Sequence, residues 1–266
     1  MPRNLGSQVA IVTGASSGIG RALARELAAK GARVALVARR TSDLEALAAE
    51  IAAQGGSALV IPGDVTVSED MTRMAQSVMQ DWGRIDILVA NAGIYVQGPV
   101  CELGIGDLER AMDVNFFGAM RAVFAVLPAM RSQGRGHLVF MSTMDVMIPI
   151  PCDGPYIASK SALTGLAQVM RSELKAEGIR VTVIHPGRID TPLIEHLRMP
   201  FASPKVSPEA LARHTMRTIV RGRRRLIYPA SGYLYLIRDL WPALGDWLIA
   251  ALRLQGWPAT SHGKDV

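Results

Sequence analysis

The first thirty residues combine an apolar run, a glycine-rich turn and a helical pattern, and this order constrains the fold more than any other feature. Residues 9–12 are all apolar, which is typical of a parallel strand buried on both faces of a sheet. Apolar residues recur at helical spacing from Ile19 to Ala28. A glycine turn between a strand and a helix predicts a dinucleotide phosphate site, since the backbone can approach the pyrophosphate closely and the helix presents free N–H groups. The turn contains Gly14, Gly18 and Gly20.

Further apolar runs alternate with helical stretches along the chain and show no internal repeat. This alternation predicts an α/β fold with a doubly wound parallel sheet, the Rossmann-type architecture. We expect one dinucleotide-binding and catalytic domain over residues 1–230. Residues 231–266 are expected to form an apolar, amphipathic helical extension that is not an independent domain. The expected strands are residues 33–38, 58–61, 87–90, 137–141, 180–184 and 226–228.

Composition limits the classes of partner and compartment. The formal charge of +6 permits contact with nucleic acid or anionic membrane, but four arginines are crowded into residues 221–225. Basic and aromatic residues do not interleave, so we expect no nucleic-acid partner. Cys101 and Cys152 form neither a disulfide framework nor a metal-ligand pattern, and we expect no metal site. The first seven residues contain no apolar stretch, so we expect no secretory signal and a cytoplasmic protein.

Two arginines stand at the end of the second expected strand, where an acid would bind the ribose hydroxyls of NAD. An arginine at this point accommodates the additional phosphate of NADP. Arg39 is therefore the predicted phosphate ligand, with Arg40 and Ser16 beside it. The alternative is that both arginines only solvate a loop. We expect NADP(H) in preference to NAD(H).

Tyr156 and Lys160 are four residues apart in an expected helix, so both side chains leave the same face one turn apart. A free tyrosine has a pKa of about 10. A nearby ammonium favours the phenolate and would lower that pKa, which predicts a general acid/base. The spacing alone is also compatible with a surface lysine near a core tyrosine.

These motifs together resemble the short-chain dehydrogenase/reductase family. Residues 13–20 match its Thr-Gly-x-x-x-Gly-Ile-Gly turn, and residues 156–160 match its Tyr-x-x-x-Lys pair. Residues 115–118 match its Asn-x-x-Gly pattern, and residues 186–191 match its Pro-Gly-x-x-x-Thr pattern. The resemblance covers residues 8–192. The chain departs from the family at Ala90, which stands at the first position of its usual Asn-Asn-Ala-Gly.

The resemblance implies an oxidoreductase that transfers a hydride between nicotinamide and a carbonyl or secondary alcohol. Tyr156 would move the proton, Lys160 would also hold the nicotinamide ribose, and Asn115 would hold a water that joins Lys160 to solvent. For Asn115 the alternative is a core amide bonded to nearby backbone. A non-catalytic nucleotide-binding or sensing protein is the alternative function. The implied cofactor-binding residues are Gly14, Ser16, Ser17, Gly18, Ile19, Gly20, Arg39, Arg40, Asp64, Val65, Asn91, Ala92, Gly93, Tyr156, Lys160, Pro186, Gly187, Ile189 and Thr191.

The family's catalytic serine lies thirteen residues before the tyrosine, and that position here is Thr143. Threonine offers the same hydroxyl, whereas a one-residue insertion in the loop would select Ser142 instead. The loops expected around the site are apolar, so we expect a bulky lipophilic carbonyl or alcohol. The predicted substrate-contacting residues are Ser142, Met144 and Leu193.

The C-terminal extension is a candidate contact surface for a second subunit or a membrane. Apolar residues recur at helical spacing over residues 234–252, and Pro242 would break the helix in two. We expect this stripe to pack on its own subunit or on a sister subunit in a homo-oligomer, a dimer or tetramer. The alternative is peripheral membrane contact, with Trp241, Trp247 and Trp257 at headgroup depth and the arginines at 221–225 on anionic lipid.

Overall fold

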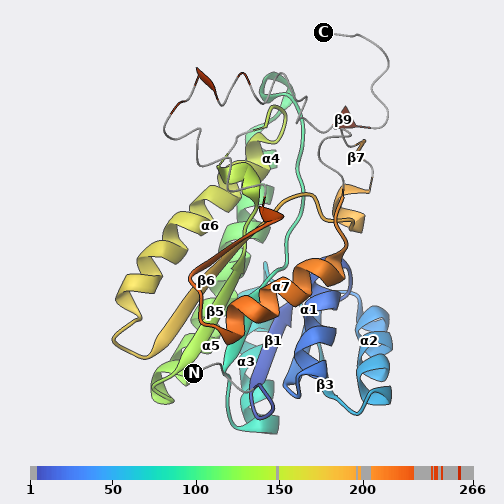
Figure 1. Ribbon diagram of the computed structural model, residues 1–266, viewed down its shortest axis with the longest axis vertical. Helices are drawn as coiled ribbons and strands as arrows, with labels where there is room; N and C mark the ends of the chain where they lie inside the picture. Colours follow the sequence, from blue (N-terminus) through green and yellow to red (C-terminus); the bar gives the residue numbers. More distant parts are fainter. Residues whose placement is uncertain are drawn as a thin grey trace.

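A computed structural model describes residues 5–147, 150–195, 197–198, 205–230, 241, 243–244, 247 and 257–258 (Figure 1). Seven parallel strands form one sheet in the order β3-β2-β1-β4-β5-β6-β8. Two short strands, β7 (Leu197–Arg198) and β9 (Trp257–Pro258), pair antiparallel beside it. The predicted doubly wound parallel sheet is confirmed. Its strands are β1 (Val9–Thr13), β2 (Arg33–Ala38), β3 (Ser57–Pro62), β4 (Ile87–Ala90), β5 (Gly136–Met141), β6 (Ile179–Pro186) and β8 (Arg225–Tyr228).

Helices connect the strands and cover both faces of the sheet (Figure 1). One face carries α1 (Gly18–Ala29), α2 (Thr41–Ala53) and α7 (Pro208–Val220). The other carries α3 (Ser68–Trp82), α5 (Gly118–Ser132) and α6 (Gly154–Glu173). Shorter helical pieces are η1 (Val100–Glu102), α4 (Ile105–Met112), η2 (Asp113–Phe117), η3 (Met144–Val146) and η4 (Pro192–Ile194).

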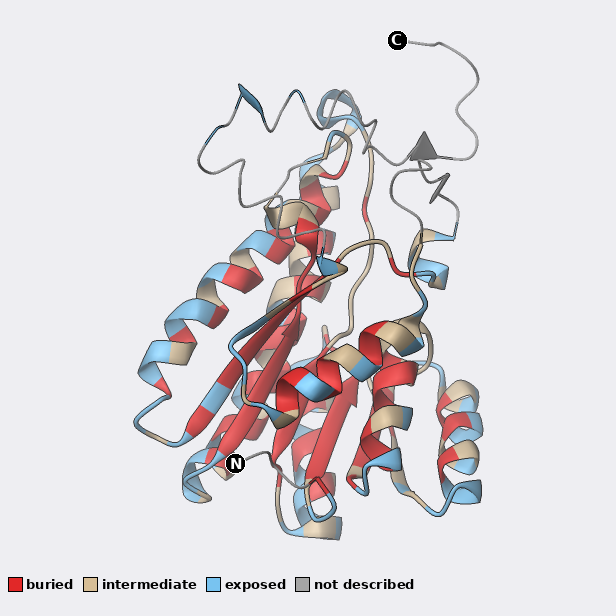
Figure 2. Ribbon diagram, viewed as in Figure 1, coloured by how far each residue is buried: buried red, intermediate tan, exposed pale blue. Residues whose placement is uncertain are grey.

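The apolar runs form strands because each strand is buried on both faces. In β1, Val9 and Ile11 pack in the cluster under α3, α5 and α6, whereas Ala10 and Val12 pack under α1, α2 and α7. Figure 2 shows this arrangement as a buried sheet between helices whose outer faces are exposed. Full burial of one leucine or valine contributes roughly 1.5–3 kcal/mol. These two apolar clusters therefore hold the sheet in place, and the residues at the strand ends are attached to a rigid base.

The stretch from Ile105 to Ser132 is helical, but it is not one uniform α-helix. Residues 113–117 form a π-helical turn between α4 and α5. Such turns insert one extra residue into the helical ladder and are frequent at functional sites. The turn contains Asn115 and brings its side chain into the protein interior.

Within the described residues, the same stretch is the one candidate long and apolar enough to cross a membrane, and half of its most apolar window is buried inside the fold. The core helix of a globular domain meets the same criterion. The predicted C-terminal helical extension, residues 231–266, lies almost entirely outside the described residues, and the domain boundary at 230 stays a prediction.

Asp86 ties the beginnings of β1 and β4 together. Its carboxylate accepts the Val9 N–H (2.9 Å) and two hydrogen bonds from Arg84 (2.7 and 2.5 Å), and the residue is 4% exposed. Asp86→Ala should lower the free energy of unfolding by about 3 kcal/mol, because both donors lose their buried partner. Urea denaturation measures this change. Asp81→Ala, at an exposed position of α3, should cost less than about 0.5 kcal/mol, and equal losses would contradict the role of Asp86.

Candidate functional site

A pocket of 680 Å³ opens where the strands end, and its lining comes mainly from the segments after β1, β2, β3, β4, β5 and β6 and from the start of α6. Every predicted cofactor-binding residue lines it except Gly20, and the predicted substrate residues Ser142 and Leu193 line it too. Asn115 and Met144 lie outside its lining. A Cβ on Gly20 would come 2.1 Å from the Gly14 carbonyl oxygen, so this glycine serves the close packing of α1 on the turn.

The glycine turn leads directly into the N-terminus of α1. Gly14 and Gly18 have φ of 67° and 52°, in the left-handed region that favours glycine. Ser17 is the N-cap residue, and in the described structure its side chain makes no capping hydrogen bond to the helix. The first N–H groups of α1 and its positive dipole end are therefore available to an anion beside Ser17, Gly18 and Ile19, which line the pocket.

Thr13 and Asn91 join the ends of β1 and β4, where the strand order reverses. The Thr13 hydroxyl accepts the N–H groups of Asn91 (3.0 Å) and Ala92 (3.1 Å), and Asn91 Nδ2 donates to the Thr13 carbonyl (3.0 Å). Open α/β sheets bind ligands at such a reversal. Thr13 belongs to the glycine motif, but its spacing does not reveal this hydroxyl as the tie between two strands.

The two arginines after β2 differ in how they are held. Arg40 donates to Ser16 Oγ (3.1 Å) and pairs with Asp43 (2.9 Å). The Arg39 side chain is 75% exposed, and its nearest carboxylate oxygen, on Asp64, is 3.8 Å away. Asp64 itself accepts hydrogen bonds from the Thr66 N–H and hydroxyl (2.9 and 2.8 Å). The glycine turn, the open end of α1 and this exposed guanidinium together fit a dinucleotide.

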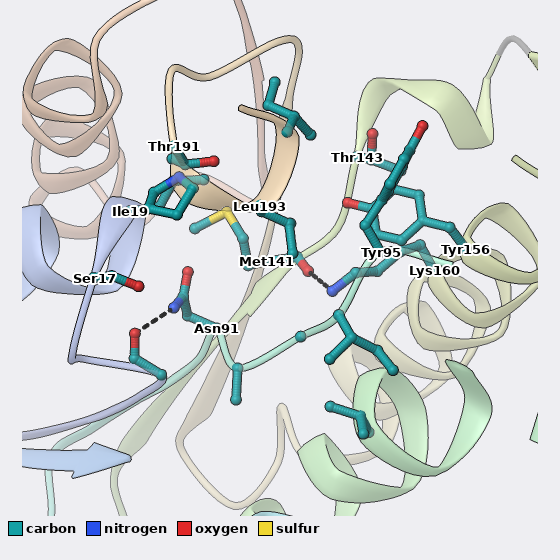
Figure 3. A pocket seen from close by; sticks show the side chains of 18 of the residues that line it. Ser17, Ile19, Asn91, Tyr95, Met141, Thr143, Tyr156, Lys160, Thr191 and Leu193 are labelled. Atoms are coloured by element: carbon teal, nitrogen blue, oxygen red, sulfur yellow. Dashed lines mark hydrogen bonds between the residues drawn. The ribbon is translucent and has the colours of Figure 1, made fainter. Parts of the chain in front are cut away.

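Tyr156 and Lys160 enter the opposite end of the pocket from α6 (Figure 3). Both are buried. The Lys160 ammonium donates to the Met141 carbonyl (2.9 Å) and lies 5.9 Å from the centroid of the Tyr156 ring. Burial lowers the pKa of Lys160 to about 8.

The predicted lowering of the Tyr156 pKa is wrong for this structure. Burial raises the pKa of the Tyr156 phenol well above its ordinary value, and the charges of Asp145 and Asp153 add to the rise. A hydrogen bond with Thr143 opposes it. The physical reason is that burial and the charges of two carboxyls disfavour the phenolate more than a single ammonium bonded to Met141 favours it.

The two candidate hydroxyls point to different partners. Ser142 Oγ shares a hydrogen bond with Thr164 Oγ1 (2.7 Å) on α6, and both residues are buried. Thr143 Oγ1 donates to Asp145 Oδ2 (2.7 Å) and takes part in the hydrogen bond with Tyr156. The Thr143 hydroxyl is therefore the one that faces the tyrosine.

Asn115 is bonded to backbone and to one hydroxyl. Its Oδ1 accepts the Ile94 N–H (2.8 Å), and its Nδ2 donates to the Ile94 carbonyl (3.0 Å) and to Ser159 Oγ (2.9 Å). This matches the core amide that the sequence left open. A Cβ on Gly93 would lie 2.9 Å from Asn115 Oδ1 and 3.4 Å from Lys160 Nζ, so both groups adjoin the same glycine. The water relay stays a prediction.

Three further side chains at the catalytic end, those of Asp145, Asp153 and Arg188, were missed by sequence reasoning, whereas Tyr95 belongs to a loop that was expected around the site. The Tyr95 ring stacks edge-on against Tyr156 (4.9 Å between centroids), and its hydroxyl donates to Asp153 Oδ1 (2.5 Å). Asp145 and Arg188 complete the set. Asp145 stands two residues after Thr143, and Asp153 stands three before Tyr156, so their spacing was an available signal. The predicted contact of Met144 is replaced by packing, since its sulfur lies 3.3 Å from where a Cβ on Gly187 would be.

Comparison with known proteins identifies the class to which this fold and site belong. The family described as short chain dehydrogenase matches residues 8–200. The chain belongs to the short-chain dehydrogenase/reductase family, and it is an NAD(P)-dependent oxidoreductase.

One of its relatives is named for a particular reaction, and another is named only as an oxidoreductase. A fatty acyl-CoA reductase of Acinetobacter baylyi is 35% identical over 225 residues, which is 84% of this chain and 76% of that protein. An uncharacterized oxidoreductase of Mycobacterium bovis is 34% identical over 245 residues, 90% of this chain and 72% of that one. The crystal structure of a metagenomic short-chain oxidoreductase in complex with NADP superimposes with a TM-score of 0.71 at 32% identity, covering 82% of this chain and 92% of that one.

Replacing Asn115 should loosen the segment after β4. Asn115→Leu keeps the side-chain volume but leaves the Ile94 N–H and carbonyl without their partner, so the free energy of unfolding should fall by about 2–3 kcal/mol. Hydrogen exchange of the Ile94 amide, followed by NMR, should accelerate more than that of neighbouring strands. Gln80→Leu on the exposed face of α3 is the control. Unchanged exchange at Ile94 would contradict this assignment.

Proposed function

We propose that this enzyme transfers a hydride between NADP(H) and a carbonyl or secondary alcohol, with Tyr156 as the general acid/base. The observation that carries the proposal is the convergence of Tyr156, Lys160 and Thr143 at one end of the pocket whose other end holds the glycine turn. When bound, the nicotinamide supplies or accepts the hydride. The protein orients the substrate and moves the proton.

In reduction, Tyr156 donates its proton to the carbonyl oxygen, and in oxidation it takes the proton of the alcohol. Its raised pKa keeps the phenol protonated at neutral pH, which supports the role of proton donor. The Lys160 ammonium stabilises the phenolate that forms as the proton leaves. Its hydrogen bond to the Met141 carbonyl supports this role by keeping the ammonium beside the phenol.

Thr143, rather than Ser142, polarises the substrate carbonyl. The hydrogen bond between Thr143 and Tyr156 supports this choice, because the two hydroxyls that act on one oxygen must lie together. The hydrogen bond between Ser142 and Thr164 supports a structural role for Ser142, because it ties the Ser142 hydroxyl to α6.

The cofactor preference is for NADP(H). The exposed Arg39 guanidinium lies in the pocket lining at the end of β2, where the additional phosphate of NADP would sit. Asp64, 3.8 Å from that guanidinium, is engaged by Thr66. The relative crystallised with NADP adds support from outside this chain.

The substrate is a bulky lipophilic carbonyl or secondary alcohol. Ile94, Ile150, Leu193 and Ile194 line the pocket, and one relative is named a fatty acyl-CoA reductase. The buried carboxyl of Asp153 and the half-buried carboxyl of Asp145 disfavour an anionic group next to the reacting carbon. We therefore propose a neutral ketone or aldehyde with an apolar chain that extends away from Tyr156.

The enzyme is proposed to be a cytoplasmic homo-oligomer. Exposed apolar side chains on α5 and α6 support an apolar contact surface: Phe124 is 63% exposed and Val169 is 50% exposed. The peripheral membrane contact considered for the C-terminal extension falls on residues 231–266, which lie almost entirely outside the described residues.

Removing the Tyr156 hydroxyl tests the reaction. With a panel of ketones and aldehydes of graded chain length, Tyr156→Phe should lower kcat/KM for NADPH-dependent reduction by about 10³-fold, because no group replaces the proton donor. The decrease in NADPH absorbance gives the rate, and fluorescence titration of NADPH should give an unchanged Kd. Turnover within tenfold of the parent would remove Tyr156 from this role. A parent protein that oxidises NADPH with no member of the panel would contradict the proposed reaction.

Exchanging the charge at the end of β2 tests the cofactor preference. Arg39→Asp should shift the ratio of kcat/KM for NADPH to that for NADH by about 100-fold toward NADH, since the phosphate loses its cation and the ribose gains an acceptor. Arg25→Asp, on the exposed face of α1, is the matched control. An unchanged ratio in Arg39→Asp means that Arg39 only solvates the loop.

A further inference from the structure

Asp145 forms a closed hydrogen-bond pair with the hydroxyl that faces the tyrosine. Thr143 Oγ1 donates to Asp145 Oδ2 (2.7 Å), and the Asp145 N–H donates back to Thr143 Oγ1 (3.2 Å). Thr143 is the N-cap residue of the short helix η3, and Asp145 lies within that helix. The Asp145 side chain lines the same pocket as Tyr156.

The Thr143 hydroxyl has one proton, which it can donate either to Asp145 or into the pocket. A threonine hydroxyl donates a single hydrogen bond, whereas an ionised carboxylate only accepts. While Asp145 is ionised it takes this proton in a charge-assisted bond, which is shorter and stronger than a neutral one. The Thr143 oxygen then offers the pocket only lone pairs, and it cannot donate a hydrogen bond to a carbonyl.

Protonation of Asp145 reverses this arrangement. The carboxylic acid can donate its own proton to Thr143 Oγ1, and the Thr143 proton is then directed toward the pocket. A carbonyl oxygen beside Tyr156 would receive two donors instead of one. In this step one O–H bond forms on the Asp145 carboxylate and one O–H bond of a hydronium ion from solvent breaks. Apart from that proton transfer, only hydrogen bonds change.

Several titratable and charged groups face Asp145. Burial raises the pKa of Asp145 to about 6, the Thr143 hydrogen bond and Arg188 oppose the rise, and the charge of Asp153 adds to it. His185 on β6 bonds the Thr143 carbonyl through Nδ1 (3.1 Å), and burial lowers its pKa, which favours the neutral imidazole. The other groups at this end of the pocket are Tyr95, Tyr156 and Lys160.

We propose that Asp145 is a positioning residue whose protonation turns the Thr143 hydroxyl toward the substrate carbonyl and so promotes reduction in mildly acidic solution. This inference rests on the proposed role of Thr143. A group with a raised pKa is protonated below that value and ionised above it, so reduction loses the Thr143 donor as the pH rises through about 6.

The kinetic test compares pH profiles. At saturating NADPH, the parent's kcat/KM for a neutral ketone should fall about tenfold between pH 5 and pH 7.5, a modest part of what one carbonyl-directed donor contributes. Asp145→Asn should abolish this step, and its rate at pH 7.5 should match the parent's rate at pH 5, because the amide N–H donates permanently to Thr143. Asp153→Asn is the matched control, since it removes a neighbouring buried carboxyl and should retain the step. His185→Gln should retain it as well.

A measurement without substrate tests the Asp145–Thr143 inference separately from the catalysed reaction. In ¹³C NMR of the whole protein, one carboxyl signal that is absent in Asp145→Asn should titrate near pH 6, and Thr143→Ala should raise its pKa because the hydroxyl no longer stabilises the carboxylate. Persistence of the kinetic step in Asp145→Asn, or an unchanged Asp145 titration in Thr143→Ala, would overturn the proposal. A parent that titrates as expected but reduces no ketone would overturn the proposed function alone.

Discussion

Burial of a parallel sheet on both faces is the constraint on which the rest of this structure depends. Strand interiors must be apolar and their backbone groups must pair with neighbouring strands, so polar side chains can gather only where the strands end. Between β1 and β4 the strand order reverses and the helices leave on opposite faces. The tie between Thr13 and Asn91 bridges this opening, and the pocket lies directly above it.

The same burial controls the chemistry of the pocket. Lys160 and Tyr156 leave water together, and each is pushed toward its neutral form. The phenol is therefore a proton donor at neutral pH, and the nearby ammonium acts at the moment when the proton leaves. The same effect acts on Asp145. Its carboxyl is half-buried beside Asp153, and burial raises its pKa to about 6.

Much of the fold and of the cofactor end of the site was predictable, because the signals are local. An apolar run, a glycine turn and a helical stripe each follow from a few adjacent residues, and Arg39 stands directly at a strand end. The catalytic end was predicted less well. Met144 packs against Gly187 instead of lining the pocket, and the π-helical turn that turns Asn115 inward leaves no mark in the apolar pattern.

The sequence by itself determined the sheet, the glycine turn, the Tyr156–Lys160 pair and the family to which they belong, since each is written in the spacing of residues along one element. Only the tertiary structure decided which of Ser142 and Thr143 faces Tyr156, and in which direction the pKa of that phenol moves. Those outcomes depend on Asp145 in η3, on Asp153 at the N-terminus of α6 and on Thr164 within α6. Their electrostatic and hydrogen-bonding effects act through space, and they exist only once folding has brought the segments together and removed the water between them.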